Sequence, residues 1–144
     1  MPVLESSTTA TLAPSRTRAA VLLAAGAIVA LAANAVIAMA ALAAGASSAF
    51  SPLLVFVYGP FTVVGLLAAF AGWRIVRRRA RNPRAVLRVL VPVLAVLSFV
   101  PDTILAITGF IPATTLTGVV ALMLMHLVVV AIAVPLSARL APVR

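Results

Sequence analysis

Four long runs of apolar residues are the feature that most constrains how this chain can fold. They cover about residues 19–44, 54–77, 85–109 and 115–137, and each reaches the ~20 residues that a helix needs to cross a bilayer. The runs are apolar on all sides instead of alternating, which indicates helices and not barrel strands. Short connections between them predict an all-α integral membrane protein, built as an antiparallel bundle of four transmembrane helices.

Composition agrees with this fold class and excludes others. Of the 144 residues, 65% are apolar and 9% are charged, whereas soluble domains average about 45–50% and about 25%. A soluble monomer could not bury so much apolar surface, and a disordered chain would carry far more charge. The chain has no Cys and no Lys, and its only acidic or histidine side chains are Glu5, Asp102 and His126. We therefore expect no enzyme, no cofactor and no metal site.

The positive charge predicts the orientation of the helices. All eleven arginines lie outside the connections at 45–54 and 110–115, so they fall on one side of the bundle. The positive-inside rule then predicts a multi-pass plasma-membrane protein with both termini in the cytoplasm. Because no aromatic residues interleave with the arginines, nucleic acid is not an expected partner. Anionic lipid headgroups are the expected partners of the arginine-rich connection, at Arg77, Arg78, Arg79, Arg81, Arg84 and Arg88.

The first residues are rich in Ser and Thr. Residues 1–18 are predicted to be a disordered cytoplasmic tail, followed by one transmembrane domain over 19–140. A cleavable signal peptide is the alternative, because Ala38-Met39-Ala40 has the small-x-small form of a cleavage site. An apolar segment of nearly 20 residues exceeds the usual 7–15 of such peptides, so we expect an uncleaved span.

Each predicted helix carries one notable polar residue: Asn34, Thr62, Asp102 and His126. They lie 16, 15, 14 and 13 residues from Arg18, Arg77, Arg88 and Arg139 respectively. At ~1.5 Å per residue, the four depths are roughly 20–24 Å above the arginines. The side chains are therefore expected at one level of the bundle.

Small residues indicate which way these side chains face. Asn34 shares a helical face with Ala27, Ala30, Ala38 and Ala41, and small residues line the faces where transmembrane helices touch. Asp102 shares a face with Ser98. A carboxylate inside a membrane costs roughly 2.5–3.5 kcal/mol on insertion scales, so Asp102 is expected to face His126.

Two interpretations of this polar set remain open. It is either a proton-relay or ligand site of Asp102 and His126, with Asn34, Thr62 and Ser98 as hydrogen-bond partners, or a clamp between helices. Pro101 weakens the helix beside Asp102. Tyr58 and Trp73 are predicted to be anchors at the outer and inner interfaces.

Three segments resemble a family of small four-helix membrane proteins from actinobacteria that is catalogued as a domain of unknown function. They are Gly59-Pro60-Phe61-Thr62-Val63, Leu97-Ser98 with Pro101, and ALMLMHLVVVAIAVP from Ala121 to Pro135. The resemblance covers roughly residues 16–140 and implies no activity. Asp102 is a departure from the family's usual pattern.

The first functional hypothesis is a non-enzymatic membrane protein that acts through helix packing with itself or with a membrane partner. The alternative is a small proton-coupled or solute transporter subunit that uses Asp102 and His126. A membrane enzyme is the third class, and the shortage of titratable groups argues against it.

Overall fold

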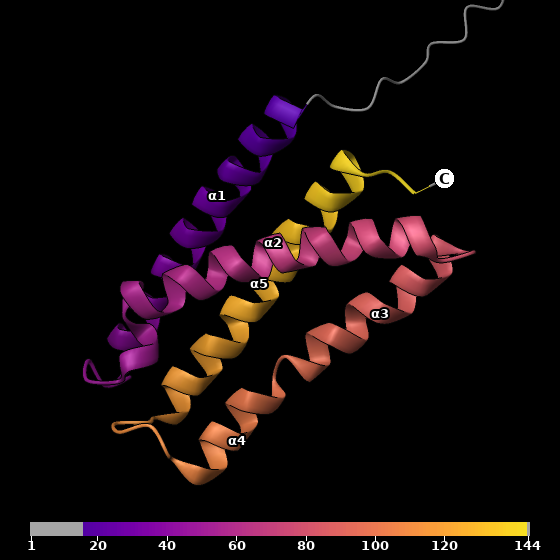
Figure 1. The fold of residues 1–144 in the computed structure, drawn as a ribbon. Helices are drawn as coiled ribbons and strands as arrows, with labels where there is room; N and C mark the ends of the chain where they lie inside the picture. Colours follow the sequence, from indigo (N-terminus) through magenta and orange to yellow (C-terminus); the bar gives the residue numbers. More distant parts are fainter. Residues whose placement is uncertain (1–15, 144) are drawn as a thin grey trace, which may run out of the picture.

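The computed structural model describes residues 16–143, and these residues form only helices and their connections. The elements are α1 (Arg16–Ala43), the 3-10 helix η1 (Ser51–Leu53), α2 (Val55–Arg79), α3 (Pro83–Leu97), α4 (Val100–Thr108) and α5 (Leu116–Leu140) (Figure 1). Four spans are long and apolar enough to cross a membrane: α1, α2, α3 together with α4, and α5. The all-α prediction with four membrane-length spans is thus confirmed for the described residues.

The first helix begins earlier than expected. Arg16 and Arg18, which the sequence placed in the tail, belong to α1. Arginine and alanine are both good helix formers, and no Gly or Pro separates Arg16 from the apolar run. The rest of the predicted tail, residues 1–15, lies outside the described residues.

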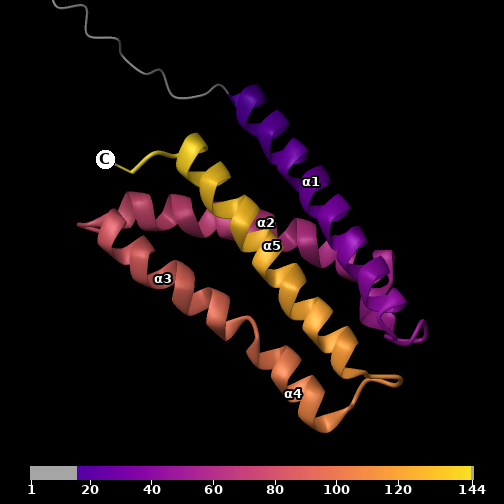
Figure 2. The ribbon, with the colours of Figure 1, turned by 180° about the vertical axis from the view of Figure 1, so that it is seen from behind.

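The last helix, α5, is the centre of the arrangement. It contacts α1, α2, α3 and α4. Figures 1 and 2 show α1 on one side of α5, the α3–α4 span on the other, and α2 crossing α5 obliquely. Large apolar side chains such as Phe61 and Ile107 are 75% and 80% exposed. An outer surface of this kind fits a hydrocarbon environment, where apolar side chains have no reason to turn inward.

The buried core lies around the connection between α1 and α2. Phe50, in that connection, is fully buried, and a Cβ on Gly118 of α5 would come within 2.8 Å of its ring. Tyr58 belongs to the same cluster and is only 8% exposed. The prediction of Tyr58 as an interfacial anchor is therefore wrong, because the ring packs against the core residues of the connection instead of facing the interface.

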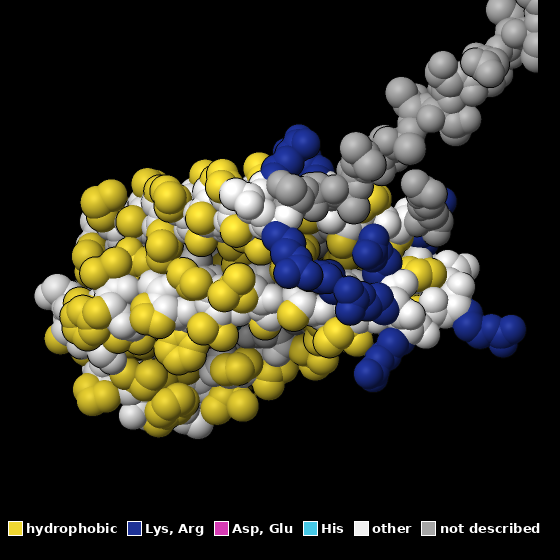
Figure 3. Space-filling model, turned by 45° about the horizontal axis from the view of Figure 1, so that its top comes forward, with side chains coloured by type: hydrophobic (Ala, Val, Ile, Leu, Met, Phe, Trp, Pro, Cys, Tyr) yellow, Lys and Arg dark blue, Asp and Glu magenta, His cyan; other side chains and the backbone are white. Residues whose placement is uncertain are grey.

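The arginines of the described residues gather at the opposite end of the molecule from this core. Figure 3 shows the dark blue side chains at one end and apolar side chains over most of the remaining surface in view. Arg77, Arg78 and Arg79 form the last turn of α2. Trp73 lies near them, and its Nε1 donates a hydrogen bond of 2.9 Å to the carbonyl of Ala141, just after α5.

Candidate functional site

A break in the third span positions Asp102. α3 ends at Leu97 and α4 begins at Val100, where the sequence predicted one continuous run. Pro101 has no N–H to donate to the carbonyl four residues earlier, and its ring crowds that carbonyl. The last turn of α3 closes with bonds of 2.9 Å from Ser98 N to Leu94 O and 3.1 Å from Phe99 N to Val96 O.

The break creates a helix start within the span. Asp102 lies in the first turn of α4, where the partial positive charge of a helix N-terminus favours a carboxylate. The side chain is 8% exposed. The position of Asp102 thus offsets part of the cost that a carboxylate meets in an apolar environment.

The structure brings Asp102 and His126 together across the α4–α5 contact. Asp102 Oδ2 lies 3.2 Å from His126 Nδ1. The imidazole also meets the ring of Phe99 edge to face, with centroids 6.5 Å apart. Its side chain is 42% exposed, so His126 lies at the edge of the helix packing and not at its centre.

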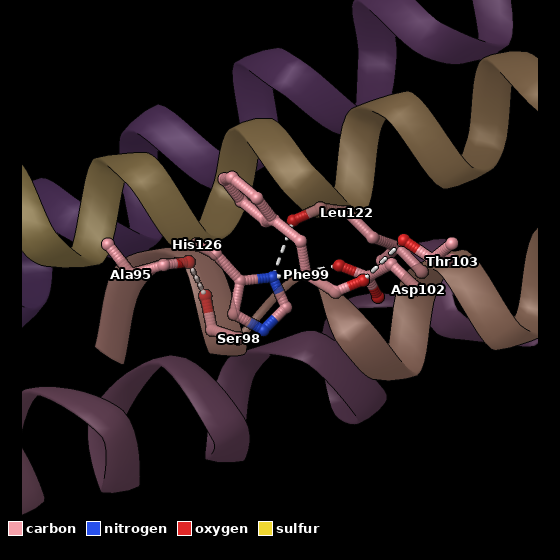
Figure 4. Close-up of polar contacts among 7 residues, drawn as sticks. All are labelled: Ala95, Ser98, Phe99, Asp102, Thr103, Leu122 and His126. Carbon is pink, nitrogen blue, oxygen red and sulfur yellow. Dashed lines mark hydrogen bonds and ion pairs between the residues drawn. The ribbon is translucent and has the colours of Figure 1, made fainter. Parts of the chain in front are cut away.

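The same imidazole nitrogen has two candidate acceptors. Figure 4 shows His126 Nδ1 directed at the carbonyl of Leu122, at 2.8 Å. A carbonyl oxygen can only accept, so Nδ1 carries a proton and donates it there. Asp102 Oδ2, at 3.2 Å from the same nitrogen, is then left buried without a hydrogen bond. Two oxygens therefore compete for one N–H.

A second polar pair links α1 and α2. Asn34 Nδ2 donates to Thr62 Oγ1 at 2.8 Å, and the Thr62 hydroxyl donates to the carbonyl of Tyr58 at 2.9 Å. Asn34 is 1% exposed, and its Oδ1 has no hydrogen-bond partner. Asn34 and Thr62 were expected to hydrogen-bond with the Asp102–His126 pair. Instead they bond to each other, because α1 and α2 face one another directly.

The two pairs lie beside the same core cluster. Ala38, Tyr58 and Leu105 belong to this cluster, and Leu122 packs against it. Each of these residues is one turn away from a polar residue, in the direction away from the arginines. This arrangement fits the common depth expected from the sequence.

In the described part of the chain, the other predicted site residues form no hydrogen bond with these two pairs. The Ser98 hydroxyl donates to the carbonyl of Ala95 at 2.7 Å, which helps to close α3. The candidate headgroup arginines are exposed at the arginine end: Arg77, Arg78, Arg79, Arg81, Arg84 and Arg88. The described residues hold no group of three or more His, Cys, Asp or Glu side chains that could bind a metal.

Three parts of the site were not predicted from the sequence. They are the Phe99 ring, the Leu122 carbonyl and the new helix start at Val100. The proline two residues after Phe99 was a usable signal for the helix start. The Leu122 carbonyl lies four residues before His126 on α5, so helical spacing could have indicated it. The ring contact depends on how α5 is rotated against the segment that contains Phe99, which no spacing rule reports.

Four membrane-length apolar helices with polar pairs between them define the class of multi-pass helical membrane proteins. Within this class, residues 12–142 match the model of a family described as "Family of unknown function (DUF6069)", and the chain belongs to that family. The family assignment agrees with the resemblance to an uncharacterised family. No curated protein and no solved structure matches the chain.

Proposed function

We propose that this protein is a non-enzymatic plasma-membrane protein that acts by packing its helices against a second copy of itself or another membrane protein. The observation that carries the proposal is that the His126 side of the Asp102–His126 pair is exposed at the surface of the bundle. The His126 side chain is 42% exposed, and among the described residues its Nε2 has no hydrogen-bond partner. A partly exposed imidazole is unfavourable in hydrocarbon, and a partner helix would supply a hydrogen-bonding group for it.

The proposed topology follows from the charge. The arginine end lies in the cytoplasm by the positive-inside rule, which gives an antiparallel bundle with both termini cytoplasmic. The actinobacterial resemblance of the chain accords with a plasma-membrane location. The proposal assigns no catalysis, because Asp102 and His126 are the only carboxylate and imidazole within the spans.

Association can be measured by energy transfer between copies in vesicles. The chain has no Cys, so Ser48→Cys gives one labelling site at an exposed position of the α1–α2 connection. Donor- and acceptor-labelled copies are expected to show transfer that rises with protein density. His126→Phe keeps a ring but removes its nitrogens, and it is expected to weaken association about five- to thirtyfold, as loss of one interhelical hydrogen bond of ~1–2 kcal/mol implies.

Asn34→Ala is the matched control. It removes a polar side chain that is 1% exposed and bonds only within the bundle, so association should not change. Transfer that is equally strong in wild type and His126→Phe would refute the role of this face. Absence of transfer at every density would refute packing between copies and leave a different membrane protein as the partner to seek by crosslinking.

A small proton-coupled transporter is the second candidate, favoured by the competition at His126 Nδ1. His126 Nδ1 lies 2.8 Å from the carbonyl oxygen of Leu122 and 3.2 Å from Asp102 Oδ2, so its proton has two acceptor oxygens within reach. Ionisable pairs inside the membrane often relay protons. Proton flux in liposomes tests it, with wild type compared with Asp102→Asn. Flux that Asp102→Asn abolishes would support transport, whereas no flux in either protein would leave only the packing role.

A further inference from the structure

An apolar cavity lies between α2, α3 and α5, in the half of the molecule that carries the arginines. Its volume is about 300 Å³, and its lining includes Gly72, Leu94 and Ala133. This volume is at the lower end of ordinary ligand pockets. A cavity with such a lining does not hold water well, because water needs two or more polar partners.

A second hollow of about 360 Å³ adjoins the cavity on the side of the arginine end. The two hollows share the lining residues Trp73, Leu87, Val91 and Val134, and we call the two together the groove. The second hollow adds Arg84 and Arg88 to the lining. The groove therefore has an apolar inner part and a cationic mouth.

The mouth is built from two arginines one helical turn apart. Arg84 and Arg88 lie on the same face of α3. Arg84 Nε donates to the carbonyl of Val143 at 3.2 Å, which ties α3 to the segment after α5. The one carboxylate among the described residues is Asp102, and it lies beside His126, so neither arginine has an acidic side-chain partner there.

We propose that this groove binds one anionic phospholipid from the leaflet at the arginine end. One acyl chain would fill the cavity between α2, α3 and α5, and the phosphate would lie against Arg84 and Arg88. Guanidinium groups match phosphate with paired hydrogen bonds. A free anion would leave the apolar cavity unfilled, and a neutral lipid would leave the arginine charge uncompensated. The inference does not use Asp102 or His126 and is independent of the proposed function.

Trp73 makes the site directly observable. It is the only tryptophan of the chain and lines both parts of the groove. A lipid with brominated acyl chains quenches tryptophan fluorescence only on contact. In phosphatidylcholine vesicles, a minor fraction of brominated phosphatidylglycerol is expected to quench Trp73 far more than the same fraction of brominated phosphatidylcholine.

Two pairs of variants test the two parts of the groove. Arg84→Gln with Arg88→Gln should lower the preference for phosphatidylglycerol roughly 25-fold, since loss of each arginine's contact with the bound phosphate should contribute about a fivefold effect. Arg77→Gln with Arg78→Gln removes the same charge from the end of α2 and should keep most of the preference.

Gly72→Leu should fill the cavity, because a Cβ there meets no atom within 4 Å, and it should reduce quenching by the bound lipid. Ala71→Leu adds the same kind of side chain on the exposed side of α2 and should have no such effect.

Three results would overturn the proposal. These are equal quenching by the two brominated lipids in the wild type, a preference that survives in the Arg84 and Arg88 variant, and equal losses in the two arginine pairs. Inorganic phosphate should not displace the lipid. Displacement by phosphate alone would identify a simple anion site and would also contradict the proposal. Circular dichroism of each variant in the same vesicles verifies that the helices remain folded.

Discussion

The Asp102–His126 pair predicts an asymmetric response to truncation. His126→Leu would remove the imidazole that lies 3.2 Å from a carboxylate with 8% exposure, and removing one partner of a buried ion pair is costly because the remaining charge is uncompensated. Asp102→Leu would leave His126 with its 2.8 Å bond to the Leu122 carbonyl. The contact that it removes is 3.2 Å long and lacks an aligned hydrogen bond.

The magnitudes follow from these contacts. His126→Leu should lower the free energy of unfolding by about 2 kcal/mol, which is less than the ~3–5 kcal/mol for breaking a fully buried ion pair because His126 is 42% exposed. Asp102→Leu should change it by less than about 1 kcal/mol in either direction, because the loss of the contact is offset by removal of a buried charge. The double variant should resemble Asp102→Leu, which gives a coupling energy of about 2 kcal/mol between the two sites.

Reversible unfolding of the monomer in bicelles measures all four proteins of this cycle. Leu124→Ala is the control, since Leu124 lies on the same helix and is 45% exposed; its effect should stay within about 0.5 kcal/mol. The reasoning is refuted if Asp102→Leu destabilises as much as His126→Leu, or if the two effects simply add in the double variant.

Three further predictions concern the rest of the bundle. Thr62→Val should lower the free energy of unfolding by about 1–3 kcal/mol, because it leaves the whole Asn34 amide buried without a partner. Gly118→Ala should cost about 1–3 kcal/mol by overpacking, since the new Cβ would lie 2.8 Å from the buried Phe50 ring. Pro101→Ala should join α3 and α4 into a continuous helix and lengthen the distance between spin labels at positions 93 and 107.

Each of these predictions has a control or an outcome that contradicts it. Asn34→Ala should cost less than Thr62→Val, because Thr62 keeps its bond to the Tyr58 carbonyl. Gly72→Ala should stabilise α2 by about 0.5–1 kcal/mol, since the added Cβ meets open space. A neutral Gly118→Ala would show that Phe50 moves freely. Unchanged label distances in Pro101→Ala would show that packing against α5, and not the proline, causes the break.

The sequence predicted the four spans well because the bilayer leaves few choices. A backbone in hydrocarbon must satisfy its own hydrogen bonds, so runs of this length and composition form helices. The positions of the arginines relative to these runs also predicted that the charge gathers at one end of the molecule. The inward face of α1 was also predictable: Ala30, Asn34, Ala38 and Ala41 are its buried residues, because small side chains allow close helix packing.

The tertiary structure decided which residues meet. Depth along each helix brings four polar residues to one level, but the pairing of Asn34 with Thr62 and of Asp102 with His126 depends on which helices are neighbours. The rotation of α5 about its axis leaves the His126 side chain half-exposed. Residues of the α1–α2 connection belong to the same cluster as Tyr58, so this side chain is part of the core and is not the interfacial anchor that was predicted. Helical period and hydropathy describe one helix at a time. Pairing, burial and the groove beside Arg84 are properties of helices packed together, and they appear only in the assembled bundle.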